Sequence, residues 1–313
     1  MINLEGKVAV VTGSGRGIGK AYAKALAAHG AAVVVNDIDA DVCEATVKEI
    51  VDGGGRAVGE AVGVGPTEAA ERLVARAVEA FGRLDAMVTN AGVLRDKMLW
   101  KLEDEDFDVV VSTHLRGTFT CARAAVKQIR AQNEAAGEDG RKGGRIVAVS
   151  SVAGQYGNFG QTAYAAAKAG IAAMVRTWAL ELERAQIAVN AIVPNALTRM
   201  VATIPGMGEV VEAAERGEPV PESFRMGMGM GTADDVAPLL VFLCSDGAAD
   251  ITGQAIGLGG DKLSLFAHPY EKSTAYMPGG WTAERITELF DQTVGQDLEA
   301  YGIPFLGRKK PGT

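Results

Sequence analysis

A doubly wound α/β fold, in which helices cover both faces of a parallel sheet, is the fold class that this sequence predicts. Short apolar runs alternate along the chain with longer amphipathic segments. The short runs are apolar at nearly every position, which is typical of strands that are buried on both faces. A glycine-rich turn also joins the first run to the first amphipathic segment, as is usual in such sheets. We therefore expect a single domain over residues 1–260, followed by a C-terminal extension over residues 261–313.

The elements can be assigned in chain order. Strands are expected in KVAVVTG, AAVVVND, RAVGEAVGV, LDAMVTNAG, GGRIVAVSS and GQAIGL, with a further strand before Pro194. The helical segments include GKAYAKALAAHG, ADVCEATVKEIVDGG and TEAAERLVARAVEAFG. Residues 200–231 break the alternation with proline, glycine and methionine, which predicts either a lid over a pocket or a loosely packed surface excursion. The extension contains one clear helical pattern, TAERITELFDQTVGQDLEAYG.

Composition excludes several classes of protein. The chain of 313 residues has a net charge of -8, which argues against nucleic acid as a partner, because binding to a phosphate backbone depends on clustered lysine and arginine. Its three cysteines are far apart and match no metal-binding spacing, so we expect no metal site and a reducing compartment. The N-terminus lacks the pattern of a signal peptide, and no apolar run reaches the ~18 residues of a membrane span. These features indicate a cytoplasmic protein with no membrane partner.

The sequence VVTGSGRGIGKAYA is the first motif with a chemical meaning. Gly13, Gly17 and Gly19 end a buried strand and open a helix, which lets the backbone approach a pyrophosphate at the helix N-terminus. A nucleotide is therefore the favoured ligand, and Arg16 and Ile18 in the same turn are candidates to contact it.

Asp37 ends the second strand, in VVVNDI, where a carboxylate can bind the adenosine 2'-hydroxyl and would repel a 2'-phosphate. Arg16 acts in the opposite sense, because a guanidinium in the turn can accommodate the 2'-phosphate of NADP. The carboxylate at the ribose is expected to dominate, so the sequence favours NAD. A carboxylate that only caps a loop is the alternative interpretation of Asp37.

A tyrosine and a lysine four residues apart, in QTAYAAAKAG, form the second motif. On a helix, Tyr164 and Lys168 lie on the same face, so an ammonium group is held close to a phenol. Such a pair on its own is more often an exposed surface pair than a functional site, so its meaning depends on the other motifs.

Taken in order, the motifs resemble those of the short-chain dehydrogenase/reductase family, which has a Rossmann fold. The resemblance covers residues 5–260 and rests on TGSGRGIG, NAG at 90–92, SS at 150 and 151, YAAAK at 164–168, and Pro194. The segments NAGVLRDKM, HLRGTF, YGNFGQTAY and PNALTRM further resemble the branch that contains the (3R)-hydroxyacyl-CoA dehydrogenase domain of peroxisomal multifunctional enzyme type 2 and its bacterial relatives.

The resemblance implies a role for each motif. Tyr164 is then the general acid/base that exchanges a proton with the substrate oxygen, Ser151 holds that oxygen, and Lys168 binds the nicotinamide ribose. A free phenol has a pKa near 10, and a cation ~4 Å away at a dielectric near 20 is worth about 4 kcal/mol, or roughly three pKa units. We therefore expect Lys168 and the oxidised nicotinamide to lower the pKa of Tyr164. The remaining residues implied to bind NAD are Val64, Asn90, Ala91, Gly92, Thr198 and Ile192, the last through its backbone.

Three positions depart from the family pattern. His114, in HLRG, stands where most members carry an asparagine that holds a helix and a water on the proton path from the lysine. A neutral imidazole also offers one donor and one acceptor, so we expect His114 to be a fourth catalytic residue, with a buried structural histidine as the alternative. Gly63 replaces the aspartate that usually meets adenine, which leaves only the backbone of Gly63 and Val64 for that contact. Asn195 replaces the glycine that usually follows the proline.

The function favoured by these residues is an NAD-dependent oxidoreductase that interconverts a secondary alcohol and a ketone, on a 3-hydroxyacyl-CoA or a sterol-derived acyl-CoA. One alternative is a free steroid or other hydrophobic alcohol, which the methionine-rich RMGMGMG would suit equally well. The other is a cofactor-binding protein without catalysis, although Ser151, Tyr164 and Lys168 are all present.

We also expect a homodimer or homotetramer. Family members pair through the helices after the fourth and fifth strands, here DEDFDVVVSTHLRGTFTCARAAVKQI and TAYAAAKAGIAAMVRTWALELER. The aromatic residues of the extension would leave apolar area in water if it stood alone, so it is expected to lie across the pocket or a neighbouring subunit.

Overall fold

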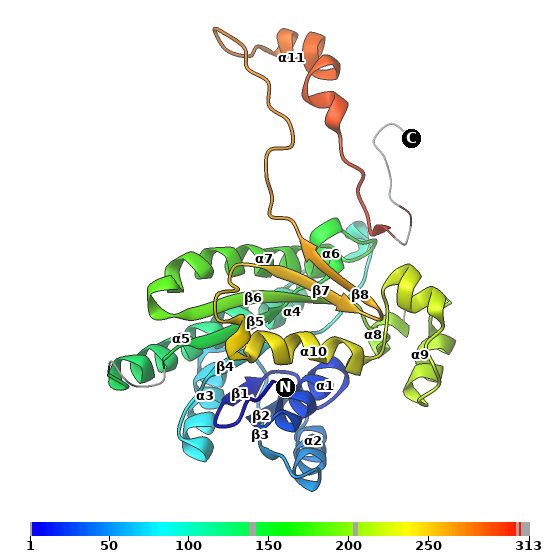
Figure 1. Ribbon diagram of the computed structural model, residues 1–313. Coiled ribbons are helices and arrows are strands. Elements are labelled where there is room, and N and C mark those ends of the chain that lie inside the picture. The colour runs from blue at the N-terminus through cyan, green and yellow to red at the C-terminus, as the bar shows by residue number, and fades with distance from the viewer. Residues whose placement is uncertain (1, 138–141, 203–205, 305–306, 308–313) are drawn as a thin grey trace.

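One eight-stranded sheet runs through the protein, in the strand order β3-β2-β1-β4-β5-β6-β7-β8 (Figure 1). The structure is a computed structural model that describes residues 2–137, 142–202, 206–304 and 307. Strands β1 to β7 are parallel, and β8 pairs antiparallel with β7. In order, the strands are Val8–Val11, Ala32–Asp37, Arg56–Ala61, Ala86–Thr89, Gly144–Val149, Ile187–Pro194, Ala255–Gly259 and Lys262–Phe266. The doubly wound parallel sheet predicted from the sequence is confirmed.

Helices cover both faces of this sheet. One face packs against α1 (Gly17–Ala28), α2 (Ala40–Asp52) and α10 (Ala233–Cys244). The other packs against α3 (Thr67–Phe81), α5 (Gly117–Ala135) and α7 (Thr162–Leu182). The short helices α4 (Asp104–Val111) and α6 (Val152–Tyr156) lie in the connections. Within the described ranges, no helix is both long enough and apolar enough to span a membrane.

The apolar strand pattern follows from burial on both sides. Every residue of β1, β2, β4 and β5 is buried. Successive side chains of a strand point to opposite faces, so Val33 and Val35 enter one core while Val34 enters the other. A strand that contributes to two cores has no polar face, which explains the near-continuous valine and alanine runs.

The carboxyl ends of β1 and its neighbours β2 and β4 define a topological switch point. From β1 the chain proceeds outward to β2 and β3, and then returns to the other side of β1 as β4. The connections after β1 and β4 therefore leave in opposite directions, and a crevice opens between them.

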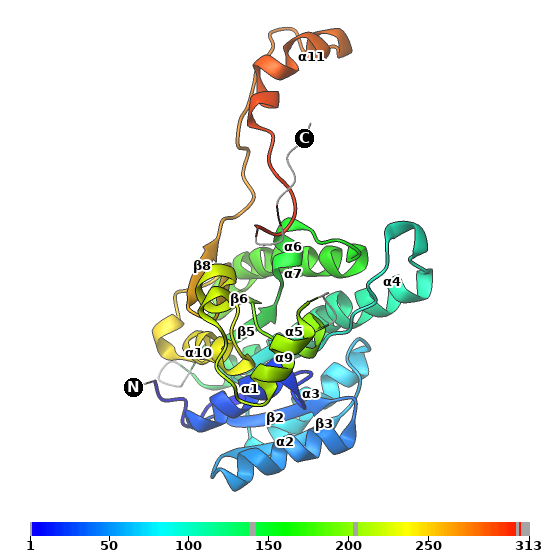
Figure 2. The same cartoon turned by 90° about the vertical axis from the view of Figure 1, so that its right-hand side faces the viewer.

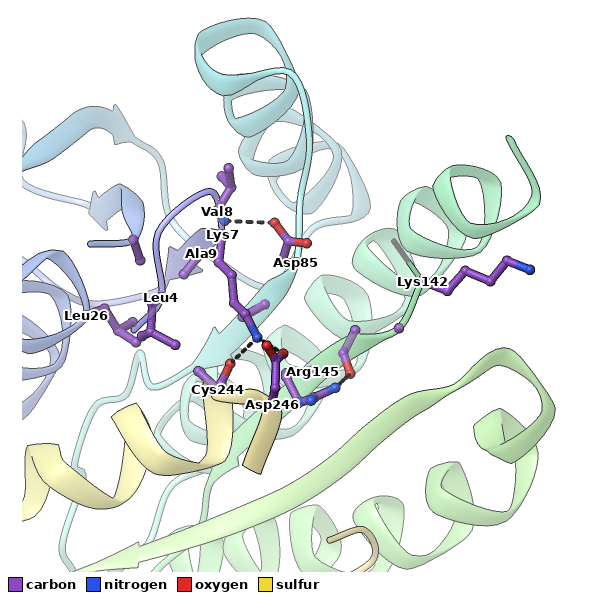
Figure 3. Close-up of a pocket in the computed structure, with 14 residues that line it drawn as sticks. Leu4, Lys7, Val8, Ala9, Leu26, Asp85, Lys142, Arg145, Cys244 and Asp246 are labelled. Atoms are coloured by element: carbon purple, nitrogen blue, oxygen red, sulfur yellow. Dashed lines mark hydrogen bonds and ion pairs between the residues drawn. The ribbon is translucent and has the colours of Figure 1, made fainter. Parts of the chain in front are cut away.

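The opposite edge, at the amino ends of the strands, is closed by a polar cluster around a cavity of about 40 Å³ (Figure 3). Asp85 Oδ2 accepts the backbone N–H of Val8 at 2.9 Å. Lys7 Nζ donates to the carbonyl of Cys244 at 3.2 Å and pairs with Asp246. These contacts connect β1, the start of β4 and the end of α10, so the cluster is structural.

The segment between β6 and α10 forms a small packing unit beside the sheet. Its elements are α8 (Arg199–Ala202), α9 (Gly208–Glu215) and a π-helical turn (Ser223–Met228). Leu197, Val211 and Met230 form its buried centre. Residues 203–205 of the predicted excursion lie outside the described residues. The described remainder is a packed layer, which agrees better with a lid than with a loose loop.

Arg225 anchors this layer to the rest of the fold. Its guanidinium pairs with Asp235, in the first turn of α10, at 3.1 Å, and with Asp261, after β7, at 2.7 Å. One side chain thus joins the lid, α10 and the start of the extension.

The extension begins as β8 and then leaves the body as an arm, residues 267–299, that stands away from the sheet (Figures 1 and 2). The helix in it, α11 (Ala283–Leu289), is much shorter than the pattern predicts, and 3-10 turns follow it. The chain then returns to the body, where the N–H of Gly302 donates to the carbonyl of Tyr156 at 3.0 Å and Ile303 is buried. The arm is therefore held at both ends.

Candidate active site

A cleft of about 1460 Å³ lies at the carboxyl ends of the strands, where the switch point predicts a ligand crevice. Its wall is formed by the segments after β1 to β6, together with α7 and the lid. Pockets for one small ligand usually have ~300–1,000 Å³, so this cleft has room for a dinucleotide and a second molecule. Every residue predicted for the site lines it except Ile192.

The turn between β1 and α1 requires its glycines. Gly13 and Gly17 have φ values of +61° and +56°, which residues with a Cβ rarely adopt. A Cβ on Gly19 would lie 2.1 Å from the carbonyl oxygen of Gly13. No side chain caps the start of α1, so its first backbone N–H groups remain available to an anion. Arg16 and Ile18, on either side of Gly17, also line the cleft.

Asp37 lies at the end of β2 and is only 7% exposed. Arg16 Nη2 is 3.8 Å from Asp37 Oδ1 and 3.4 Å from Asp39 Oδ2. The guanidinium therefore lies between two carboxylates. Ile38, next in the chain, is exposed in the cleft beside Gly63, so an apolar surface adjoins the carboxylate.

The NAG segment holds the glycine turn in place. Thr12 Oγ1 accepts the N–H groups of Asn90 and Ala91 at 3.0 and 3.1 Å. The Asn90 side-chain amide donates to the carbonyls of Thr12 and Gly13, both at 3.0 Å. The Asn90 side chain thus binds the protein's own turn, while Ala91 and Gly92 face the cleft.

Asn36 forms a second set of hydrogen bonds that holds the glycine turn, and this residue was not predicted from the sequence. Its Oδ1 accepts the N–H of Gly13 at 3.3 Å, and its Nδ2 donates to the carbonyls of Glu60 and Val62 at 3.0 and 2.8 Å. The segment after β3, with Val64 on the cleft wall, is thereby fixed to the glycine turn.

Ser151, Tyr164 and Lys168 meet at the end of β5, as predicted. Ser151 is the N-cap of α6, where its Oγ accepts the N–H of Ala153 at 3.2 Å, and it also hydrogen-bonds the phenol of Tyr164. Lys168 Nζ is 5.6 Å from the centre of the Tyr164 ring and donates to the carbonyl of Val149 at 2.6 Å. One turn of α7 and one strand end thus bring a hydroxyl, a phenol and an amine together.

In the protein alone the pKa of Tyr164 is raised, whereas the lowering expected from the sequence included the charge of the oxidised nicotinamide. Burial raises this pKa, the Ser151 hydrogen bond lowers it, and the charge of Asp96 raises it further, with a net increase. The expectation omitted the cost of burying a phenolate and assumed a full charge on Lys168. Burial lowers the pKa of Lys168 to about 7, so its ammonium is itself only partly charged at neutral pH.

His114 lies in a π-helical turn, Ser112–Arg116, between α4 and α5; such turns are frequent at functional sites. Its ring packs edge-on against Tyr164, with centres 5.1 Å apart. Its Nε2 is 2.8 Å from the carbonyl oxygen of Val93 and 3.0 Å from the backbone nitrogen of the same residue. Burial and the charge of Lys168 lower its pKa to about 3, despite the hydrogen bond to Val93, so the imidazole is neutral. Among the described residues, its Nδ1 has no partner although it is buried.

Comparison with known proteins agrees with this geometry. A family model described as enoyl-(acyl carrier protein) reductase matches residues 13–260. The chain belongs to the short-chain dehydrogenase/reductase family. It is 39% identical over 261 residues to mouse peroxisomal multifunctional enzyme type 2, in a match that covers 80% of this chain and 31% of the mouse protein. It is 38% identical over 304 residues to a hydroxyacyl-CoA dehydrogenase of Mycobacterium tuberculosis, covering 95% of this chain and 92% of that one.

A solved short-chain dehydrogenase from Mycobacterium avium has the same fold. The TM-score is 0.78 at 34% sequence identity, and the match covers 93% of this chain and 95% of that one. The protein is therefore an oxidoreductase of this family, and the correspondence with that structure extends beyond the sheet into the extension.

Gly92 makes room for His114 in this family member. A Cβ at Gly92 would lie 2.2 Å from His114 Cε1. Gly92→Ala is therefore expected to displace the imidazole and to cost about 1–3 kcal/mol in the free energy of unfolding, as overpacking does. Urea denaturation would measure it, with Gly227→Ala as the control, because a Cβ there meets nothing within 4 Å. Equal stabilities of the two variants would contradict this prediction.

Ile192 is the predicted residue that the structure does not bring to the cleft. Its side chain is fully buried in the core, and its carbonyl accepts the N–H of Ser150 at 2.8 Å. The part of this segment that lines the cleft runs from Pro194 to Thr198, so Thr198 is correctly placed for a ligand while Ile192 supports β5.

Among the cleft residues that were not predicted from the sequence are Asp96, Gln161 and Ile303. Gln161 precedes Tyr164 by three residues at the start of α7, and this spacing could have drawn attention to it. Ile303 comes from the returning end of the extension, which no local pattern predicts. In the described part of the chain, no group of three acidic, histidine or cysteine side chains is arranged to hold a metal ion.

Proposed function

We propose that this protein is an NAD-dependent dehydrogenase that interconverts a secondary alcohol and a ketone on a 3-hydroxyacyl-CoA or a sterol-derived acyl-CoA. The main support is that Ser151, Tyr164 and Lys168 share one cleft with the glycine turn and Asp37. The Mycobacterium tuberculosis relative, which is named for hydroxyacyl-CoA, matches nearly the whole chain including the extension. The proposal includes assembly as a homodimer or homotetramer.

The residues present fit NAD. The turn over Gly13–Gly19 would hold the pyrophosphate, because no side chain caps the start of α1 and its first backbone N–H groups can bind an anion. Asp37 would bind the adenosine ribose, the backbone at Val64 the adenine, Lys168 the nicotinamide ribose, and Thr198 the carboxamide. The bound nicotinamide would supply the acceptor or donor of hydride.

The protein's own residues would handle the proton. Ser151 would hold the substrate oxygen by a hydrogen bond, and Tyr164 would give a proton to that oxygen or take one from it. With its raised pKa, the phenol is protonated at neutral pH and is ready to act as an acid. For alcohol oxidation, it would need positive charge nearby, from Lys168 and from the oxidised cofactor.

His114 would continue the proton path in place of the usual asparagine. Lys168, with a pKa of about 7, can exchange a proton near neutral pH. The unpartnered Nδ1 of His114 is a buried nitrogen of a neutral imidazole in the same region. We propose that protons reach and leave Lys168 past this nitrogen.

Replacing Asp37 by serine is expected to shift cofactor preference toward NADP by about 10- to 100-fold, because it removes the repulsion of a 2'-phosphate and frees Arg16 to bind it. The ratio of kcat/KM for the two cofactors measures this. Asp39→Ser is the matched control: Asp39 also pairs with Arg16, at 3.4 Å, but does not line the cleft. If the unmodified protein prefers NADP, the proposal that Asp37 outweighs Arg16 in cofactor choice is wrong.

Activity with a small substrate panel distinguishes the proposed function from its alternatives. Turnover of a 3-hydroxyacyl-CoA with NAD supports the proposal. Turnover of a free hydroxysteroid alone favours the alternative of a hydrophobic alcohol, which the apolar cleft residues Leu94, Val152 and Phe159 also suit. Tight NAD binding without turnover of either class would indicate a cofactor-binding protein.

A further inference from the structure

Asp96 places a negative charge beside the candidate catalytic tyrosine. It lies in the segment between β4 and α4, on the cleft wall, and its Oδ2 accepts Nε2 of Gln161 at 2.8 Å. Its charge contributes to the raised pKa of Tyr164. A carboxylate here opposes deprotonation of the phenol, so the proton transfer itself does not require it.

Neighbouring cations do not neutralise this carboxylate. Lys97 pairs with Asp106 at 2.5 Å and with Glu103 at 3.0 Å. Arg95 is 3.9 Å from Asp106 and donates to the carbonyl of the preceding residue at 2.7 Å. In the described residues, no ion pair includes Asp96. Because a carboxylate has about four acceptor positions, one amide hydrogen bond leaves Asp96 able to accept more.

The position of Asp96 is fixed by its surroundings. Gln161 is held in turn, since its Oε1 accepts Nδ2 of Asn158 at 2.9 Å. The N–H of Lys97 donates to the carbonyl of Gly160 at 2.9 Å, which joins the Asp96 segment to the loop before α7. These hydrogen bonds join Asp96 to the start of α7, so the carboxylate and Tyr164 lie on the same wall of the cleft.

A fixed anionic acceptor selects a ligand with an N–H or O–H donor and rejects a ligand with a carboxylate at the same place. An acyl-CoA carries its first amide N–H two carbons beyond the thioester sulfur, in the pantetheine arm. A free hydroxy acid has a carboxylate in place of the thioester, and a free steroid alcohol has no N–H. We infer that Asp96, held by Gln161, accepts the first pantetheine amide N–H and so selects acyl thioesters over free acids. This inference rests on the proposed function and specifies its substrate class.

Two short thioesters that differ only in this N–H test the inference. The 3-hydroxybutanoyl thioester of N-acetylcysteamine keeps the amide N–H, and its N-methyl amide analogue lacks it. The kcat/KM ratio of the two is expected to be about tenfold or more in the unmodified protein, the size of one hydrogen bond to a charged group. It should fall close to one in Asp96→Ala and stay unchanged in the control Glu79→Ala, whose side chain is exposed on α3 outside the cleft. Free 3-hydroxybutanoate should gain activity relative to the thioester in Asp96→Ala and not in Glu79→Ala.

A second variant separates recognition from a merely structural role. Asp96→Asn keeps the size of the side chain and can still bond Gln161, so it is expected to fold even if Asp96→Ala does not. Its N–H to N-methyl ratio should lie below that of the unmodified protein, and the pH at which oxidation rises should fall, because a negative charge near Tyr164 is lost. A ratio that is the same in the unmodified protein and in both Asp96 variants overturns the inference but leaves the proposed function standing. Absence of thioester turnover in the unmodified protein, with turnover of a free steroid, overturns the proposed function itself.

Discussion

Tyr164→Phe is expected to lower kcat by about 10²–10⁴-fold, the usual contribution of a positioned general acid/base, while NAD binding is retained. The change removes only the phenolic oxygen. The ring keeps its edge-on contact with His114, at 5.1 Å between centres, so the wall of the cleft should not move. Turnover can be followed through NADH absorbance, and NAD binding can be measured separately by titration calorimetry.

Lys168 provides the contrasting variant. It is buried and donates to the carbonyl of Val149 at 2.6 Å, so Lys168→Met, which keeps most of the volume, removes that hydrogen bond and the proposed ligand of the nicotinamide ribose. Both kcat and NAD affinity are expected to fall, whereas Tyr164→Phe affects kcat alone. Near-normal turnover in the Phe variant would show that another group carries the proton, and the mechanism would then be wrong.

The sheet could be predicted from the sequence because its signals are local. A strand buried on both faces must be apolar throughout. Where two parts of a turn lie so close that a Cβ would collide with the backbone, as at Gly19, only glycine fits. The structure of the extension was harder to predict. The pattern over 282–302 predicts one helix, but α11 ends at Leu289. In the described part of the chain it packs mainly against the 3-10 turn that follows it, which gives a longer helix little stabilisation. The pairing of β8 with β7 likewise depends on a tertiary contact.

In the candidate site, too, some features have local sequence signals and others depend on tertiary contacts. Its motifs follow successive strands, so the topology of a parallel sheet brings Gly13, Asp37, Ser151 and Tyr164 to one edge. Asp96 could not be placed in this way, because its position depends on how a long connection folds against α7. The raised pKa of Tyr164 in the protein alone could not be predicted for a related reason: the cost of burying a charge is not visible in a motif.

Two surfaces of the structure suit the predicted assembly. On α7, the exposed side chains Ala166, Ala169 and Ala173 form a stripe of small residues along which a second helix could approach closely. On the arm, Tyr276 and Tyr270 are 89% and 74% exposed. Burying one such large side chain contributes roughly 1.5–3 kcal/mol, so an arm that remained in water would forgo a large stabilisation. We therefore expect the arm to pack on a second copy of the chain.

Ending the chain after Pro269 is expected to reduce the size of the assembly, lower the melting temperature and raise KM for the substrate. This variant keeps β8 and the bond from His268 to the carbonyl of Gly253 at 2.9 Å, so the sheet itself is preserved. It removes the arm, and also Ile303, which lines the cleft. Ile303→Asp separates the two roles, because it leaves the arm intact and should raise KM without changing the mass measured by light scattering. A full-length protein that is monomeric would contradict the predicted assembly, and unchanged activity and stability in the shortened chain would contradict the role given to the extension.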